Sequence, residues 1–137
     1  MIEIWISGRA VGKARPRLSR YGVHTPTRYA EWKRNTILQL MALKLPPAPI
    51  PAKVDCFFVN FLSSDTDNLT GALLDSLVEA GVLKNDSSSF VASSSGTFVK
   101  TCKKRGRDKP LGVLVQIAPM QVELLDLDIV ANLHSVA

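Results

Sequence analysis

Apolar and polar positions alternate at the start of the chain. In MIEIWI, the residues Ile2, Ile4 and Ile6 recur with a period of two, which predicts a strand with one buried face. Glycines, prolines and five basic residues follow in SGRAVGKARPRLSRYGVHTP. Because so many residues here disfavour regular structure, we expect an exposed basic loop rather than a further element.

The spacing then becomes helical. Thr27 is a suitable N-cap and Pro46-Pro47 a suitable stop, so we expect a helix over residues 27–44. Its apolar face is predicted to contain Tyr29, Trp32, Ile37, Leu40 and Met41. After the connector PPAPIP, the segment KVDCFFVNFL is almost continuously apolar and rich in β-branched and aromatic residues. That pattern is typical of an interior strand covered on both faces.

A second helical pattern spans about residues 67–80 and ends at Gly81, a residue favoured just after a helix. Its apolar stripe comprises Leu69, Leu73, Leu74, Leu77 and Val78. The segments GTFVKTC and LGVLVQIA are predicted to be strands that pair as a hairpin around the basic turn KKRGRDKP. Trp5 and Trp32 are interpreted as packing residues. Residues 119–137 are expected to form a C-terminal tail or short helix.

Length and composition favour one folded domain over residues 1–137. The chain is 46% hydrophobic and 21% charged, which is typical of a globular protein long enough to bury a core. The element order predicts an α/β (α+β) fold with a small mixed sheet and two main helices. No apolar run is long enough to span a bilayer, so we expect a cytoplasmic protein without membrane contact. Cys56 and Cys102 lack metal-ligand spacing and are interpreted as reduced packing residues.

Charge is distributed unevenly along the chain. The net charge is +5, yet residues 65–86 contain five acids against one lysine, between two strongly basic blocks. Residues 1–34 hold eight Lys and Arg against two acids, and residues 100–109 hold six against one. Basic blocks of this kind are expected in nucleic-acid binders, because cations neutralise phosphates and release counterions. Charge alone does not establish such a function.

The acidic block allows two interpretations. Asp65 and Asp67 follow a predicted buried strand and begin a predicted helix, where carboxylates are favoured on structural grounds alone. Alternatively, a turn into the helix brings both carboxylates together with Asp86 from the next loop, and a cation between them relieves their repulsion. Oxygen ligands favour Mg²⁺ or Mn²⁺. A divalent ion beside a basic surface is the chemistry of a phosphodiester nuclease.

Three motifs, in order, resemble the RusA family of Holliday junction resolvases. The segment GRAVGKARPR resembles the family's G-x-x-x-x-K-x-R-P-R pattern, and HTPTRYAEWK resembles its TP-containing segment before the first helix. The segment DTDNLTGALLDSLVEAGVLKND resembles the central D-x-D-N…LD-L…G…D signature. The resemblance spans most of the chain.

The resemblance implies a homodimeric α/β crossover junction endodeoxyribonuclease that acts in DNA recombination and repair. It implies paired symmetric nicks in four-way DNA junctions, with Mg²⁺ as cofactor, for which Mn²⁺ can substitute. The implied catalytic and metal-binding residues are Asp65, Asp67 and Asp86, with Asp75 as a supporting acid. The implied DNA-binding residues are Lys13, Arg15 and Arg17; from charge alone we add Lys103, Lys104, Arg105 and Arg107.

One position departs from the family pattern, which usually continues D-x-D-N-x-x-K. Here Gly71 stands in place of the lysine. On a helix, residue 71 shares a face with Asp67 and Asp75, so a lysine there would project toward the acids. Lys84 and Lys100 are the candidates considered as replacements for this charge.

Two alternatives to a resolvase stay open. Because Gly71 replaces the expected lysine, one is a non-catalytic or weakly active junction-binding protein with the same fold and surface. A basic RNA-binding domain would have acids that are only structural.

Overall fold

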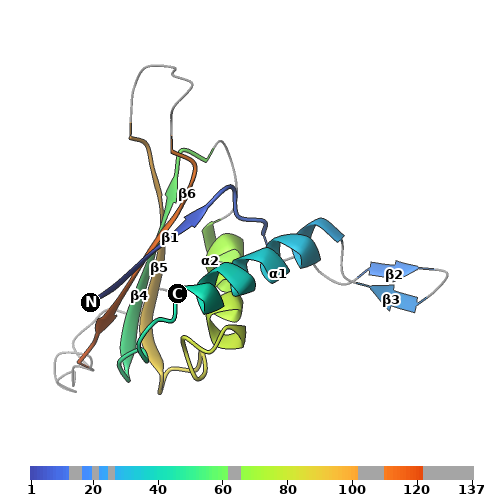
Figure 1. The fold of residues 1–137 in the computed structure, drawn as a ribbon. Helices are drawn as coiled ribbons and strands as arrows, with labels where there is room; N and C mark the ends of the chain where they lie inside the picture. Colours follow the sequence, from blue (N-terminus) through green and yellow to red (C-terminus); the bar gives the residue numbers. More distant parts are fainter. Residues whose placement is uncertain (13–16, 20–21, 25–26, 62–65, 102–109, 122–137) are drawn as a thin grey trace, which may run out of the picture.

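The computed structural model describes residues 1–12, 17–19, 22–24, 27–61, 66–101 and 110–121 (Figure 1). The side chains of residues 17–19, 22–24, 66 and 67 are outside this description. The elements in chain order are β1 (Ile2–Ser7), β2 (Arg17–Ser19), β3 (Gly22–His24), α1 (Thr27–Ala42), β4 (Ala52–Val59), α2 (Thr66–Glu79), β5 (Val91–Val99) and β6 (Gly112–Pro119). The fold is mixed α+β, with a four-stranded mixed sheet and two helices, as predicted.

The strand order of the main sheet is β1-β6-β4-β5. Strand β6 is antiparallel to both β1 and β4, whereas β4 and β5 are parallel. The predicted hairpin between the last two strands is therefore wrong, since β4 lies between β5 and β6. The apolar β4 gains a hydrogen-bonding partner on each edge in this arrangement, and the serine-rich β5 occupies the edge of the sheet, where polar residues are tolerated.

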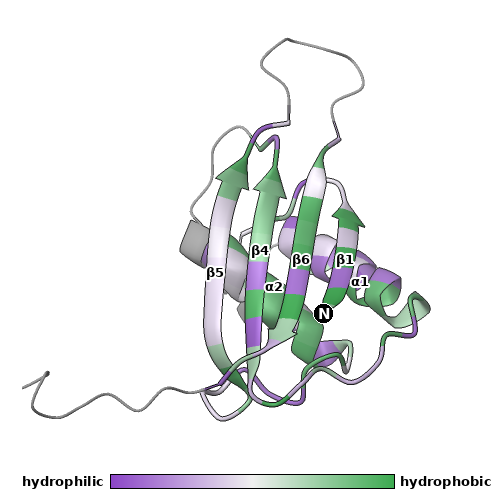
Figure 2. Ribbon diagram, turned by 90° about the vertical axis from the view of Figure 1, so that its left-hand side faces the viewer, coloured by the Kyte–Doolittle hydropathy of each residue, from purple (hydrophilic) through white to green (hydrophobic). Residues whose placement is uncertain are grey.

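Both helices cover one face of the sheet, and the other face is uncovered by the described residues (Figure 2). Ile4 and Ile6 point into the core, which confirms the period-two pattern of β1. The core between sheet and helices also includes Val54, Cys56, Phe58, Leu69, Leu73, Leu77, Val113, Val115 and Ile117. Alternate residues of three adjacent strands thus supply the buried face of the sheet.

The prediction that β4 is covered on both faces is wrong. Its residues alternate between buried and partly exposed, with Lys53 exposed and Phe57 half-buried on the face away from the helices. Trp5 lies on that face as well and is 43% exposed, so its interpretation as a core residue is wrong. Trp5 stands opposite Leu114, which in turn stands opposite Phe57.

Helix α1 begins at Thr27, as expected, and ends at Ala42. Tyr29 and Leu40 are buried as expected, but Met41 is 58% exposed. Thr36, which the apolar pattern did not include, is buried. Helix α2 ends at Glu79, and Gly81 adopts a φ of +82° that glycine accepts without strain. The predicted C-terminal role of Gly81 is therefore confirmed.

The basic segment after β1 contains regular structure that its composition did not predict. Strands β2 and β3 form a small antiparallel sheet, with Ser19 opposite Gly22 across a two-residue connection. Pro16 and Pro26 lie outside the two strands in the sequence. They therefore border the hairpin rather than interrupt it, which is why counting prolines and glycines was misleading.

Cys56 is buried and free, in agreement with its predicted packing role. Burial raises the pKa of its thiol to about 12, with a smaller contribution from the neighbouring carboxylate of Asp55. The thiol is therefore protonated and unreactive at neutral pH. Cys102 lies outside the described residues. No helix in the described part of the chain is both long and apolar enough to cross a membrane.

Candidate acidic site and nucleic-acid interface

Three connecting segments leave the main sheet at the same edge. Ser7 of β1 stands opposite Gly112 of β6, Gly112 stands opposite Val59 of β4, and Val59 stands opposite Val99 of β5. The segments that follow β1 and β4, and the one that joins β5 to β6, therefore all begin or end at this row (Figure 1). We call this row of strand ends the loop edge; it is distinct from the outer strands β1 and β5, which form the lateral edges of the sheet.

The segments that begin or end at the loop edge differ in charge in the sequence. The segment after β1 leads to Lys13, Arg15 and Arg17, and the segment from β5 to β6 contains the stretch KKRGRDK at 103–109. The segment after β4 leads to Asp65. Of the DNA-binding residues implied above, Lys13, Arg15, Lys103, Lys104, Arg105 and Arg107 lie outside the described residues, and so does the side chain of Arg17.

A close contact joins the first basic segment to the acidic motif. A Cβ atom at Gly12 would overlap with the side-chain amide of Asn68, the residue after Asp67. That amide is the end of an exposed, flexible side chain, which could move aside for a small residue at position 12. The segment that leads to Lys13 therefore starts beside the N-terminus of α2, next to the acidic motif.

Asp67 lies in the first turn of α2 and Asp75 in its second half, eight residues later, or about 12 Å along the helix axis. Gly71 lies midway, one helical turn from each. A Cβ atom at Gly71 would have no atom within 4 Å, so a longer side chain fits at this position. Asp65 and the side chain of Asp67 lie outside the described part of the chain.

Asp75 and Asp86 line one shallow hollow of about 330 Å³ beside α2. Asp86 is exposed and Asp75 is half-buried. The remaining residues that line this hollow are Lys33, Val78, Glu79 and Asn85. The structure thus places Asp86 with the predicted supporting acid Asp75, whereas its association with Asp65 and Asp67 stays a prediction.

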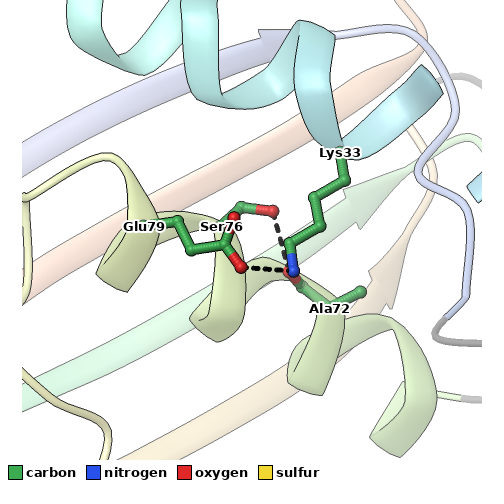
Figure 3. A network of polar contacts seen from close by, with 4 residues as sticks. All are labelled: Lys33, Ala72, Ser76 and Glu79. Atoms are coloured by element: carbon green, nitrogen blue, oxygen red, sulfur yellow. Dashed lines mark hydrogen bonds and ion pairs between the residues drawn. The ribbon is translucent and has the colours of Figure 1, made fainter. Parts of the chain in front are cut away.

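The lysine beside these acids comes from α1. The Nζ atom of Lys33 lies 2.6 Å from the Oε1 atom of Glu79 (Figure 3), and the side chain of Lys33 is 22% exposed. The hydrogen bond to Glu79, and more weakly the charge of Asp75, raise the pKa of Lys33, while partial burial opposes them. Lys84, considered above as a replacement cation, is exposed and does not line the hollow.

Replacing Lys33 with Met is expected to weaken the packing of α1 on α2. For a partly exposed pair of this kind we expect a loss of about 0.5–1 kcal/mol in the free energy of unfolding at pH 7. Because the folded-state pKa of Lys33 is raised, this contribution is present below the ordinary pKa of 10.5 and is lost as pH rises through the folded value. Urea unfolding at pH 7 and above pH 11 measures the difference.

Glu79→Gln and the double variant complete the cycle for this ion pair. If the two side chains stabilise the protein only through each other, the double variant loses no more stability than either single variant at pH 7. Strictly additive losses would show that the ion pair between Lys33 and Glu79 is not what holds the helices.

The described carboxylates do not form a metal site by themselves. Among side chains in the described part of the chain, no group of three or more His, Cys, Asp and Glu residues is placed to hold a metal ion. Carboxylate oxygens are the ligands that Mg²⁺ prefers, so Asp86 has suitable chemistry. The other two predicted ligands, Asp65 and Asp67, have no described side chain.

Sequence reasoning did not identify the role of Lys33 or the contact between Gly12 and Asn68. Lys33 ends the motif HTPTRYAEWK, but nothing in that motif indicates a pairing with Glu79, which lies far away in the sequence. In the sequence, Gly12 is one glycine among several in a basic segment. The close spacing of Gly8 and Gly12 before the first lysine was the only available signal.

The model of one family, Endodeoxyribonuclease RusA, matches residues 7–118. The chain therefore belongs to the RusA endodeoxyribonuclease family, a family of endonucleases that resolve Holliday junctions. No curated protein matches the chain.

Proposed function

We propose that this protein is a Mg²⁺-dependent endonuclease that resolves four-way DNA junctions by paired symmetric nicks during recombination and repair. The observation that supports this proposal best is the loop edge. Two segments rich in Lys and Arg, and the segment that leads from β4 to Asp65 and Asp67, all begin or end at this row of strand ends. Phosphate contacts would hold the DNA backbone while the acids act on one phosphodiester bond.

Each group of residues has a distinct part in this proposal. Lys13, Arg15 and Arg17 bind phosphates on one side of the acids, and the cations of residues 103–107 bind phosphates on the other. Asp65, Asp67 and Asp86 would hold the cation through their carboxylate oxygens. When bound, Mg²⁺ supplies Lewis-acid polarisation of the phosphate and lowers the pKa of an attacking water. Mn²⁺ would substitute because it takes the same oxygen ligands.

A homodimer suits the proposed substrate. A four-way junction has two equivalent strands to cut, and a two-fold symmetric protein presents two equivalent sites. Each subunit would then make one nick, and the two nicks would be related by symmetry.

Gly71 supports a second candidate, a junction-binding protein that cuts slowly or not at all. No cation projects from position 71, and Lys33 is already bonded to Glu79. In this case the basic surface and the fold would be retained for binding alone. Both candidates predict selective binding of branched DNA, and only the first predicts efficient nicking.

Substrate selectivity is tested by competition in EDTA, where cutting is suppressed. A labelled synthetic four-way junction is bound by the purified protein, and unlabelled junction, linear duplex of the same sequence or hairpin RNA is added. We expect the junction to compete at least about tenfold better than the duplex or the RNA, since duplex offers only non-specific phosphate contacts. Equal competition by hairpin RNA would instead support a basic RNA-binding domain and refute the proposal.

A further inference from the structure

Asn60 bonds to both ends of the segment that joins β5 to β6. Its Nδ2 atom donates hydrogen bonds to the Oγ1 atom of Thr101 (3.0 Å) and to the carbonyl oxygen of Pro110 (2.6 Å). Its Oδ1 atom accepts a hydrogen bond from the backbone N–H of Thr101 (3.2 Å). One side chain therefore fastens the residues on either side of the basic stretch 102–109.

The topology of the sheet explains why the segment between β5 and β6 is bonded to the residue that follows β4. Because β4 lies between β5 and β6, the segment that joins them must pass the end of β4. Asn60 is the first residue after β4, and its backbone N–H donates to the carbonyl oxygen of Val99, the last residue of β5. A further bond, from the N–H of Gly8 to the carbonyl oxygen of Leu111, ties the segment to the end of β1.

The backbone of Asn60 restricts which residues suit this position. Its φ of +63° lies in the left-handed region, which asparagine tolerates far better than most other residues. Asparagine also has an amide that both donates and accepts hydrogen bonds. Glycine accepts the same φ without the amide, so Asn60→Gly removes the three side-chain hydrogen bonds without straining the backbone.

We propose that Asn60 is a positioning residue, which holds Thr101 and Pro110, the two residues that border the basic segment 102–109, at the end of β4. The segment carries five Lys and Arg residues against one Asp. Tethering its two ends restricts it before DNA binds, so less conformational entropy is lost when its cations meet phosphates. That DNA is the partner rests on the proposed function.

The test compares the unaltered protein with Asn60→Gly in two assays. In EDTA, we expect the variant to bind a four-way junction about five- to tenfold more weakly, since a tethered segment pays less ordering entropy on binding. In limited trypsin digestion followed by mass spectrometry, we expect cleavage within residues 103–109 to be at least about fivefold faster. Asn60→Asp keeps the acceptor for the Thr101 N–H but loses both donated bonds, and should resemble Asn60→Gly in the trypsin assay.

Lys44→Gly is the matched control. Lys44 also has a positive φ, +49°, so glycine relieves the same backbone conformation at a position outside the loop edge. We expect its junction affinity and its cleavage at residues 103–109 to stay within about twofold of the unaltered protein.

The two assays separate the inference from the proposed function. Unchanged trypsin cleavage in Asn60→Gly would show that the side chain does not hold the segment, whatever the protein binds. Faster cleavage with unchanged junction affinity would overturn the positioning role in binding. An unaltered protein that binds no junction would refute the proposed function, and the trypsin comparison would still decide whether Asn60 holds the segment.

Discussion

Asp67→Asn is expected to lower the rate of junction cleavage by about 1,000-fold or more while leaving junction affinity within about threefold. A carboxylate that holds a catalytic cation contributes several kcal/mol to transition-state stabilisation, and each 1.36 kcal/mol corresponds to a factor of ten in rate. Asparagine keeps the shape of the side chain and removes its negative charge. The same loss is expected for Asp86→Asn, measured as the single-turnover rate with saturating protein.

The structural interpretation of Asp67 predicts a different result. Asp67 lies in the first turn of α2, where a carboxylate stabilises the helix by roughly 0.3–1 kcal/mol through the helix dipole. If that were its only role, Asp67→Asn would lower the midpoint of urea unfolding slightly and leave cleavage within about twofold. Asp55→Asn is the matched control, because Asp55 lies on the sheet face away from the helices and bonds to Ser95.

Gly71→Lys is expected to raise the rate of junction cleavage by about tenfold or more. A lysine at position 71 lies one helical turn from both Asp67 and Asp75 and meets no atom near its Cβ. Its ammonium group can then orient a carboxylate or stabilise charge at the phosphate, an effect of the size expected for an electrostatic contact in a nuclease site. The measurement is the single-turnover rate at saturating Mg²⁺.

Gly71→Ala separates this effect from a gain in helix stability. Glycine in a helix interior costs roughly 1 kcal/mol relative to alanine, so both variants should unfold at higher urea concentration than the unaltered protein. Only the lysine variant should cut faster. An equal rate increase in both variants would mean that helix stability, and not a missing cation, limits the reaction.

Local elements were predictable because their signals lie in adjacent residues. The period of two in β1, the apolar stripe of α2 and the glycine after its end all appear in the structure near the expected positions. Strand order was not predictable, because pairing depends on competition between segments far apart in the chain. Strand β6 covers most of LGVLVQIA, and β5 contains only the first four residues of GTFVKTC and begins earlier, at Val91. Strand β4 separates β5 from β6, since its apolar side chains and both of its edges are better satisfied inside the sheet.

The candidate site was likewise predictable in its local motifs and not in its long-range contacts. The acids and basic blocks were visible from composition and motifs, and in the structure the strands next to these segments end in one row at the loop edge. The residues that arrange them carried no signal of their own. Lys33 and Asn60 act through partners that are more than 40 residues away in the sequence, and only the folded chain brings these pairs together.

Cleavage by the unaltered protein tests the central claim most directly. A four-way junction, labelled in turn on each strand, is incubated with the protein in Mg²⁺, in Mn²⁺ and in EDTA, with linear duplex and Asp67→Asn alongside. We predict two nicks at symmetry-related positions on opposite strands of the junction, which require metal and are absent from the duplex and the variant. Tight junction binding with no nicks in either metal would contradict the claim that this chain is an active resolvase.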